Sequence, residues 1–345
     1  MHLEPSGQVL AKEGLVVDAL ERIGRIPPGS FKLLPTVGTG TDTGTRRRAV
    51  LHWAAKRLGF FGRRTHQAVA VDVCPALVAT LAPLPGKLSA PLAPVGPALK
   101  AVHLLAEEGA VSLALELRGR IGPKSRQVAE SLIRSGVVRG VVLVEPEGRT
   151  EEVGRPVLEA PAPQAPGVRL KLRADAFAQA HGQGAATLVE RALGMLAPRP
   201  EDRALELYAG NGAFTFALAS RLASVVAVES SPLSSALASS AARQSNVTNV
   251  RWVQGDASRV AEGLVKEGAR FELLLADPPR TGAPALSRTA RALGVRTVVY
   301  VGCDAGTLSR DAGRLVEAGF RLREVQLVDL FPNTHHVEVL LAFAA

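Results

Sequence analysis

"LELYAGNGAFTFALA" (205–219) carries an apolar strand into a helix through Gly210-Asn211-Gly212. Two glycines let the backbone turn tightly and approach a ligand, and the first turn of the helix offers free N–H groups. Enzymes that bind nicotinamide dinucleotides use a related turn, but the third glycine of their GxGxxG motif would fall on Thr215. The pattern therefore predicts a cofactor site at Gly210 and Gly212 and leaves the cofactor open.

Strand-like and helical stretches alternate from residue 200 onward. The strand-like runs are 204–209, 224–229, 250–256, 271–277, 297–303, 322–330 and 338–344. Helical stretches lie between the first six, which requires crossovers and hence a mostly parallel sheet covered on both faces. Only FPNTHH (331–336) separates the last two, and so short a loop favours antiparallel neighbours. We predict an α/β fold with a seven-stranded Rossmann-like sheet, mostly parallel, with one reversed strand near the C-terminus.

Acidic residues mark the ends of successive strands, where ligands bind on such sheets. Glu206 precedes the first glycine by four residues, Glu229 ends the second strand, and Asp256 ends the third. Glu229 is placed to accept hydrogen bonds from a ribose diol, and Asp256 lies near the expected position of an adenine. Any one of them is explained as an exposed acid, but together they favour S-adenosylmethionine over a nicotinamide cofactor.

The next two strands deliver residues of more specific chemistry. LLLADPPRTG (273–282) holds Asp277 and rigid proline carbonyls at the edge of the expected cofactor site. The following strand delivers Cys303, and the last strand supplies Glu338. The alternatives are an inert core thiol for Cys303 and an exposed strand residue for Glu338. His335 and His336 are adjacent rather than at metal-ligand spacing, and we interpret them as structural.

The first part of the chain has a mixed pattern. Residues 66–73 and 111–119 resemble strands, and 125–136 resembles an amphipathic helix ending at Gly136. Several prolines in 154–167 indicate a linker or an irregular crossing. We therefore expect a smaller α+β domain over residues 1–165 and a catalytic domain over 166–345.

Positive charge is concentrated in that first part. The net charge is +9, and the whole excess lies within residues 1–200. It peaks in residues 45–66, which contain no acidic residue. The basic residues there are Arg46, Arg47, Arg48, Lys56, Arg57, Arg63 and Arg64, and Trp53, Phe60 and Phe61 lie among them. Such a surface attracts phosphate backbones, and exposed aromatic rings stack on unpaired bases. The alternative is a solvated basic face over buried aromatic rings.

Several classes of protein are disfavoured by composition. No apolar run is long enough to span a membrane, and the N-terminus lacks the pattern of a secretion signal. Two cysteines are too few for a disulfide framework or, alone, for a zinc or iron–sulfur site. We expect a reduced, cytoplasmic protein without a resident metal, and a monomer because no coiled coil is evident.

Four stretches in this order resemble the class I RNA uracil-C5 methyltransferases: LELYAGNGAFTFALA, ADPPRTG, VYVGCDAGTLSRD and DLFPNTHHVEVLLAF. The resemblance is strong over about 170–345 and thinner upstream, in VDVCPAL (71–77) and ADAFAQAHGQ (174–183). It implies that Cys303 is the nucleophile and Glu338 the base that removes a proton. By the same resemblance the cofactor or uracil contacts are Gln179, Tyr208, Glu229, Asp256 and Asp277. We add Arg280, Arg46, Arg47, Arg48, Arg63 and Arg64 as expected RNA contacts.

The expected reaction needs those residue types. Uracil C5 attacks a sulfonium methyl group only after a thiolate has added at C6, and a base must then take the C5 proton. We expect methylation of uridine C5 in structured ribosomal or transfer RNA, with S-adenosylmethionine as methyl donor. The alternatives are an RNA-binding protein that keeps the fold but has lost turnover, and a methyltransferase with another substrate.

The chain departs from the family pattern at several points. An N-terminal TRAM-type barrel and a four-cysteine iron–sulfur cluster are not recognisable, and Cys74 is interpreted as a small core residue. The usual Ser-Cys-Asn-Pro is replaced by Gly302-Cys303-Asp304-Ala305. Asp304 is expected to raise the pKa of the thiol unless its carboxylate points away. Ala213 stands where relatives often have a polar cofactor contact.

Overall fold

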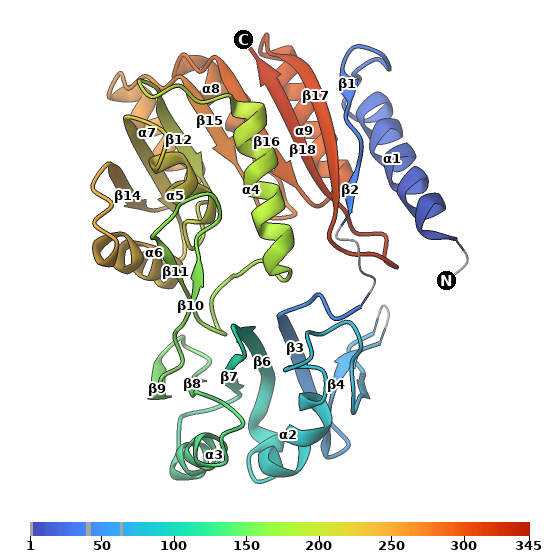
Figure 1. Ribbon diagram of the computed structural model, residues 1–345, viewed down its shortest axis with the longest axis vertical. Helices are drawn as coiled ribbons and strands as arrows, with labels where there is room; N and C mark the ends of the chain where they lie inside the picture. Colours follow the sequence, from blue (N-terminus) through green and yellow to red (C-terminus); the bar gives the residue numbers. More distant parts are fainter. Residues whose placement is uncertain (1–2, 39–42, 63–64) are drawn as a thin grey trace. The chain divides into compact units, whose positions relative to one another are not determined.

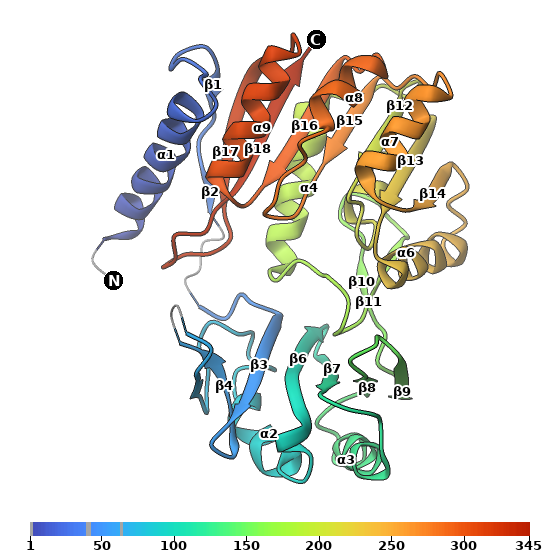
Figure 2. The same cartoon turned by 180° about the vertical axis from the view of Figure 1, so that it is seen from behind.

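The computed structural model describes residues 3–38, 43–62 and 65–345, which are drawn in Figures 1 and 2. They form two compact units. The first unit combines the residues up to 40 with 161–170 and 183–345, and the second combines 41–160 with 171–182. This division differs from the expected boundary after residue 165, because the N-terminal segment belongs with the C-terminal part of the chain.

Specific contacts explain that difference. Lys12, on helix α1 (Pro5–Arg22), donates to the Asp329 carboxylate at 2.7 Å and to the Phe331 carbonyl at 3.1 Å. The short strands β1 (Lys32–Leu33) and β2 (Val37–Gly38) pair with β17 of the first unit. In the second unit, the Arg47 N–H donates to the Ala180 carbonyl at 2.7 Å, which ties 171–182 to the strand at residue 48.

The first unit is built on one mixed sheet. Its main strands are β12 (Arg203–Leu207), β13 (Ser224–Glu229), β14 (Val250–Gln254), β15 (Leu273–Ala276), β16 (Thr297–Gly302), β17 (Arg321–Asp329) and β18 (Glu338–Ala344). The order is β17-β18-β16-β15-β12-β13-β14, and β18 is antiparallel to both of its neighbours. This confirms the predicted methyltransferase-like sheet with one reversed strand. Strands β1 and β2 were not predicted, because two-residue strands leave no periodicity to detect.

Helices cover both faces of this sheet, as the apolar character of its central strands requires. They are α4 (Gly182–Leu196), α5 (Ala213–Ala219), α6 (Pro232–Gln244), α7 (Ala257–Lys266), α8 (Leu286–Ala292) and α9 (Ala305–Glu317). One core contains side chains of α1, α7, α8 and α9, and another contains those of α4 and α5. Figure 2 shows α7, α8 and α9 in front of the sheet, and Figure 1 shows α4 on its opposite face.

The second unit is the predicted α+β domain. Its seven-stranded sheet has the order β5-β4-β3-β6-β7-β8-β9. The strands are β3 (Arg48–Ala54), β4 (Arg57–Phe61), β5 (Ala68–Ala70), β6 (Leu99–Glu107), β7 (Ala110–Leu117), β8 (Gly140–Val144) and β9 (Thr150–Gly154). Helices α2 (Leu84–Leu92) and α3 (Pro123–Arg134) pack on one core with it. Helix α3 ends just before Gly136, whose φ of 72° fits the predicted stop.

The proline-rich segment at 154–167 is more regular than a linker. It forms β10 (Leu158–Pro161), which pairs with β11 (Arg169–Leu172) in a separate two-stranded sheet. Within residues 3–38, 43–62 and 65–345, no helix combines the length and the apolar character needed to cross a membrane.

Candidate active site

The glycine turn after β12 has the backbone geometry that its sequence predicts. Tyr208, Gly210 and Gly212 have φ values of 65°, 57° and 88°. A Cβ at Gly212 would lie 2.8 Å from the Phe216 ring and 3.0 Å from the Trp252 ring, so that no larger residue fits there. Tyr208 adopts the left-handed conformation without being glycine, and such strain is concentrated at functional sites.

Glu229, at the end of β13, holds this turn in place. Its Oε2 accepts the Gly210 N–H at 2.8 Å, and its Oε1 accepts the Ser231 N–H at 2.6 Å. The Ser230 hydroxyl also donates to Oε1, at 3.4 Å. A carboxylate offers about four acceptor positions, so Oε2 keeps a further one. Glu229 therefore shapes the turn and still has the capacity to accept bonds from a ribose diol.

Asp256 follows β14 and caps α7, its Oδ1 accepting the Arg259 N–H at 3.0 Å. The parallel register aligns Leu207 of β12 with Val228 of β13 and with Ala276 of β15. The residues that follow these positions, Tyr208, Glu229 and Asp277, are thereby brought to one edge of the sheet.

Glu206 lies directly beneath the turn and is fully buried. Neither of its carboxyl oxygens has a hydrogen-bond partner among the described residues, and the buried hydroxyl of Thr215 is likewise unpartnered. Burial raises the pKa of Glu206 to about 8; the neighbouring Thr215 hydroxyl opposes this shift, and the charges of Asp277 and Glu229 add to it. Its position four residues before the first glycine is visible in the sequence, but Glu206 was not among the predicted site residues.

Cys303 and Glu338 are brought together by the antiparallel pairing of β16 and β18. Gly302 pairs with Val339, so Cys303 comes immediately after this pair on β16 and Glu338 immediately before it on β18. Residues opposite one another in an antiparallel ladder have Cβ atoms about 5 Å apart on the same face. Cys303 is partly buried, and Glu338 is only 7% exposed.

The charges of this edge act on one another. Burial raises the pKa of Cys303, Glu338 raises it further, and Arg280 lowers it through a hydrogen bond and its charge. Burial raises the pKa of Glu338 to about 8, with Asp277 adding to the shift and Arg280 opposing it. Burial raises the pKa of Asp277 to about 7. The edge thus combines a thiol, two acids that hold protons near neutral pH, and one guanidinium.

Comparison with known proteins assigns this arrangement to a family. Residues 166–344 match the family model described as tRNA (Uracil-5-)-methyltransferase. A 23S rRNA (uracil(1939)-C(5))-methyltransferase RlmD of Pseudomonas entomophila is 30% identical over the whole of this chain and 76% of its own length. The chain belongs to the RNA uracil-C5 methyltransferase family. The predicted resemblance and enzyme class are confirmed.

Two further comparisons agree with this. The RlmD of Edwardsiella ictaluri is 32% identical over 90% of this chain and 72% of the relative. The solved structure of the Pyrococcus abyssi tRNA (uracil-54, C5)-methyltransferase, in complex with S-adenosyl-L-homocysteine, has a TM-score of 0.76 and 20% identity. It covers 99% of this chain and 84% of its own, and it shows that the fold is shared.

S-adenosylmethionine is the methyl donor of this methyltransferase, as predicted, and the residues present suit it. Gly210 and Gly212 carry no side chain and adopt positive φ values, which suits a turn where the backbone approaches a ligand closely. Cofactor contacts of Glu229 and Asp256 remain predictions, and the Glu229 carboxylate has an acceptor position that suits a ligand with hydroxyl groups. Within the part of the chain that is described, no three His, Cys, Asp or Glu residues form a group that could hold a metal.

Asp304 has a structural partner at the start of α9, which the sequence did not predict. Its side chain is the N-cap of α9, with Oδ1 accepting the Thr307 N–H at 2.9 Å. The groups that raise or lower the pKa of Cys303 are Glu338, Arg280 and Asp277, not Asp304. Asn and Asp cap helices about equally well, so the family's Asn and this Asp can serve the same structural purpose.

The basic residues predicted to contact RNA in the second unit differ in their burial and in their ion pairs. Arg47 pairs with the Glu107 carboxylate from β6 and donates through Nε to the Gln179 carbonyl at 3.1 Å. Burial lowers the pKa of Arg48. Arg46 is partly buried, and Arg63 and Arg64 lie outside the described residues. Arg47 is not free for an open basic surface because β6 supplies an acid that the local sequence does not show, and Arg48 is withdrawn from it by burial.

Other residues of the stretch are more accessible. Lys56 is exposed, Arg57 pairs with Asp72 near the surface, and Phe61 is 42% exposed. Trp53 and Phe60 pack against the core of the unit instead, and so does Cys74. Gln179 lies in the second unit, and its contact with uracil or cofactor stays a prediction.

His336 was predicted to be structural, but it contacts Arg280. Its Nδ1 lies 3.3 Å from Nη2 of Arg280, and its ring lies 4.1 Å from that of His335. Spacing along the chain gave no sign of this, because 56 residues separate the two partners. His336 thus contacts the guanidinium that acts on Cys303.

Proposed function

We propose that Cys303 and Glu338 carry out methylation of uridine C5 in structured RNA, as nucleophile and base. The observation that carries this proposal is the pairing of Gly302 with Val339, which supports a close approach of the thiol and the carboxylate at one sheet edge. Ribosomal RNA is the first candidate substrate, after the names of the relatives, and transfer RNA is the second, after the name of the family.

Cys303 begins the reaction. Its sulfur forms a bond to uracil C6, and the electrons of the C5–C6 double bond move toward O4, leaving an enolate rich in electrons at C5. The raised pKa of the thiol keeps it protonated in the resting protein, so its proton must pass to solvent before the sulfur adds to C6. Arg280 opposes that shift, so its guanidinium favours the thiolate at the place where the base is attacked.

Glu338 completes the reaction. S-adenosylmethionine supplies an electrophilic methyl group when it is bound. Glu338 acts in its ionised form, after releasing its own proton to solvent. This carboxylate then accepts the C5 proton, the electrons of the broken C–H bond restore the C5–C6 double bond, and the thiolate leaves. A carboxyl with a pKa of about 8 is a stronger base than an exposed glutamate, and a pKa near the working pH is the favourable range for proton transfer.

RNA reaches the site with its target nucleotide turned out of any helix, since C6 is otherwise covered by stacking. The exposed Lys56 and Phe61 support docking of RNA on the second unit, through charge and through stacking on an unpaired base. The affinity for RNA is then expected to fall steeply as the salt concentration rises.

RNA containing 5-fluorouridine tests the proposal, because fluorine at C5 cannot be removed as a proton and the adduct persists. The native protein with S-adenosylmethionine should form an adduct that survives denaturing electrophoresis, and Cys303→Ala should form none. Cys74→Ala is the matched control and should behave as the native protein. A native protein that binds RNA and S-adenosylmethionine yet never forms the adduct would favour an RNA-binding protein that has lost turnover.

A further inference from the structure

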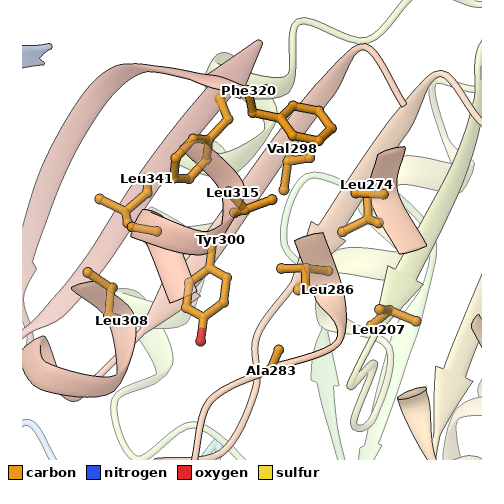
Figure 3. Packing of buried hydrophobic residues seen from close by; sticks show 14 of the residues in the cluster. Leu207, Leu274, Ala283, Leu286, Val298, Tyr300, Leu308, Leu315, Phe320 and Leu341 are labelled. Carbon is orange, nitrogen blue, oxygen red and sulfur yellow. The ribbon is translucent and has the colours of Figure 1, made fainter. Parts of the chain in front are cut away.

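Asp311, on α9, is a buried acid that the proposed reaction does not use. It is 2% exposed, and it accepts hydrogen bonds from two directions. Its Oδ2 accepts the backbone N–H of Ala283 at 2.6 Å and the Tyr300 hydroxyl at 3.1 Å. Its Oδ1 lies 3.2 Å from Nε of Arg310 and 3.2 Å from Nη1 of Arg314. Figure 3 shows the Tyr300 ring among apolar side chains, with its oxygen at the edge of the cluster near Ala283.

These bonds hold the end of the loop that follows β15. Gly282 has a φ of 81°, and a Cβ on it would lie 2.3 Å from Oδ2 of Asp311. Only glycine therefore fits between the loop and this carboxylate. Arg310 adds a hydrogen bond to the Thr281 carbonyl at 3.0 Å. The Gly282 N–H closes a turn onto the Pro279 carbonyl at 2.8 Å.

Arg280 lies inside that turn. It is exposed, so little packing fixes it directly. Its guanidinium nevertheless lowers the pKa of Cys303, which follows β16. It also lies 3.3 Å from Nδ1 of His336, in the loop before β18. Two rigid prolines restrict the loop before Arg280, and Asp311 restricts it after Arg280.

We propose that Asp311 is a positioning residue, which fixes the backbone at Thr281–Ala283 and thereby holds Arg280 against Cys303. This inference rests on the proposed function, in which Cys303 is the nucleophile. Asp311 touches neither the thiol nor the expected substrate position, and it acts only through the loop. A purely structural role would stabilise the fold without affecting the reactivity of the thiol.

The chain offers a direct readout of that reactivity, because Cys74 and Cys303 are its only cysteines. In a Cys74→Ala background, the rate of alkylation by iodoacetamide as a function of pH gives the titration of Cys303 alone. The charged groups that face this thiol are Arg280 and Asp277 from the loop and Glu338 from β18. Asp311→Asn keeps the shape of the side chain but removes its charge and one acceptor oxygen.

With Asp311→Asn we expect the alkylation midpoint to rise by about one pH unit, because Arg280 is no longer held beside the thiol. The kcat for RNA methylation should fall about 10- to 100-fold, with KM for RNA changed by no more than about twofold. Tyr300→Phe removes one hydrogen bond and no charge, and it should shift the midpoint in the same direction by less.

Asp202→Asn is the matched control. Asp202 is also 2% exposed, but it lies before β12 and pairs with Arg296 at 2.6 and 2.7 Å. It should lower the melting temperature and leave the midpoint unchanged. The proposal is overturned when Asp311→Asn leaves the midpoint where Asp202→Asn leaves it. Where Asp311→Asn does not fold, Tyr300→Phe decides in the same way.

The alkylation readout needs no methylation, so the two proposals fail separately. A shifted midpoint in a protein that forms no 5-fluorouridine adduct supports the positioning role and contradicts the proposed reaction. An adduct with an unshifted midpoint supports the reaction and contradicts the positioning role.

Discussion

Buried carboxyl groups lie at both ends of the sheet of the first unit, and their pKa values are shifted in opposite directions. At the amino end, Asp202 meets the Arg296 guanidinium with both oxygens and also accepts the Arg199 N–H at 2.7 Å. Its pKa is lowered, chiefly by the hydrogen bond from Arg296. At the carboxyl end, burial raises the pKa of both Glu206 and Glu338 to about 8.

The different pKa shifts at the two ends of the sheet reflect different roles, in stability at the amino end and in chemistry at the carboxyl end. A buried charge with a complete set of partners supports the fold, whereas a buried acid without them costs folding free energy and takes up a proton instead. The carboxyl end also holds Tyr208 in the left-handed region, which adds strain at the same place. Strain and unpaired acids at the carboxyl end are what a site needs that must bind a ligand and move a proton.

Glu338→Gln gives the largest expected effect, because it leaves shape intact and removes the base. Turnover should fall about 100- to 10,000-fold, and an adduct between Cys303 and ordinary uridine RNA should accumulate, since the C5 proton stays in place. Transfer of radiolabelled methyl groups and denaturing electrophoresis measure the two results.

Glu338→Gln should not destabilise the protein, although it lowers turnover. Glutamine removes an acid whose ionisation is disfavoured, so the free energy of unfolding at pH 8 should not decrease. Glu272→Gln at the amino end, where Arg203 bonds the carboxylate at 2.9 Å, is the control and should keep full turnover. Full turnover by Glu338→Gln would assign the base to another residue.

The dependence of stability on pH should differ between the ends of the sheet. The pKa of Glu206 rises from 4.5 to about 8 on folding, so its contribution is fully present below pH 4.5 and is lost as pH rises through 8. The loss is about 1.4 kcal/mol per pH unit at most for one group. Asp202 has a lowered pKa, so its contribution is present above its ordinary value of 3.8 and is lost as pH falls.

Urea denaturation of the protein without cofactor, between pH 5 and 8, checks this prediction. Glu206→Gln should flatten the fall in unfolding free energy with pH, and Asp202→Asn should leave that slope unchanged in this range. Trp252 belongs to the first unit, and its fluorescence in a Trp53→Phe background reports on this unit. Equal slopes for the native protein and Glu206→Gln would mean that Glu206 finds a partner in solution.

The sequence predicted most of the first unit, because alternation of strands and helices dictates a parallel sheet and strand ends dictate where ligands bind. It predicted Cys303 and Glu338 as catalytic residues through a resemblance, and the pairing of β16 with β18 explains how residues 35 positions apart come to lie at one edge of the sheet. It did not predict the attachment of α1, since Lys12 and Asp329 are 317 residues apart and neither has a local signal. The pairing of Arg47 with Glu107 was hidden for the same reason.

Asp304 is an exception to this comparison. It lies at the carboxyl end of the sheet, but its carboxylate has hydrogen-bond partners as Asp202 does at the amino end. The α9 backbone and the Thr307 hydroxyl both donate to its Oδ1, at 2.9 and 3.2 Å. Asp304→Asn should therefore leave the alkylation midpoint of Cys303 unchanged within about 0.2 pH unit and the unfolding free energy within about 0.5 kcal/mol. Asp304→Ala should cost about 1 kcal/mol through loss of the cap. A midpoint that drops clearly in Asp304→Asn would show that this carboxylate faces the thiol after all, and that an acid which caps a helix still belongs to the chemistry of its end of the sheet.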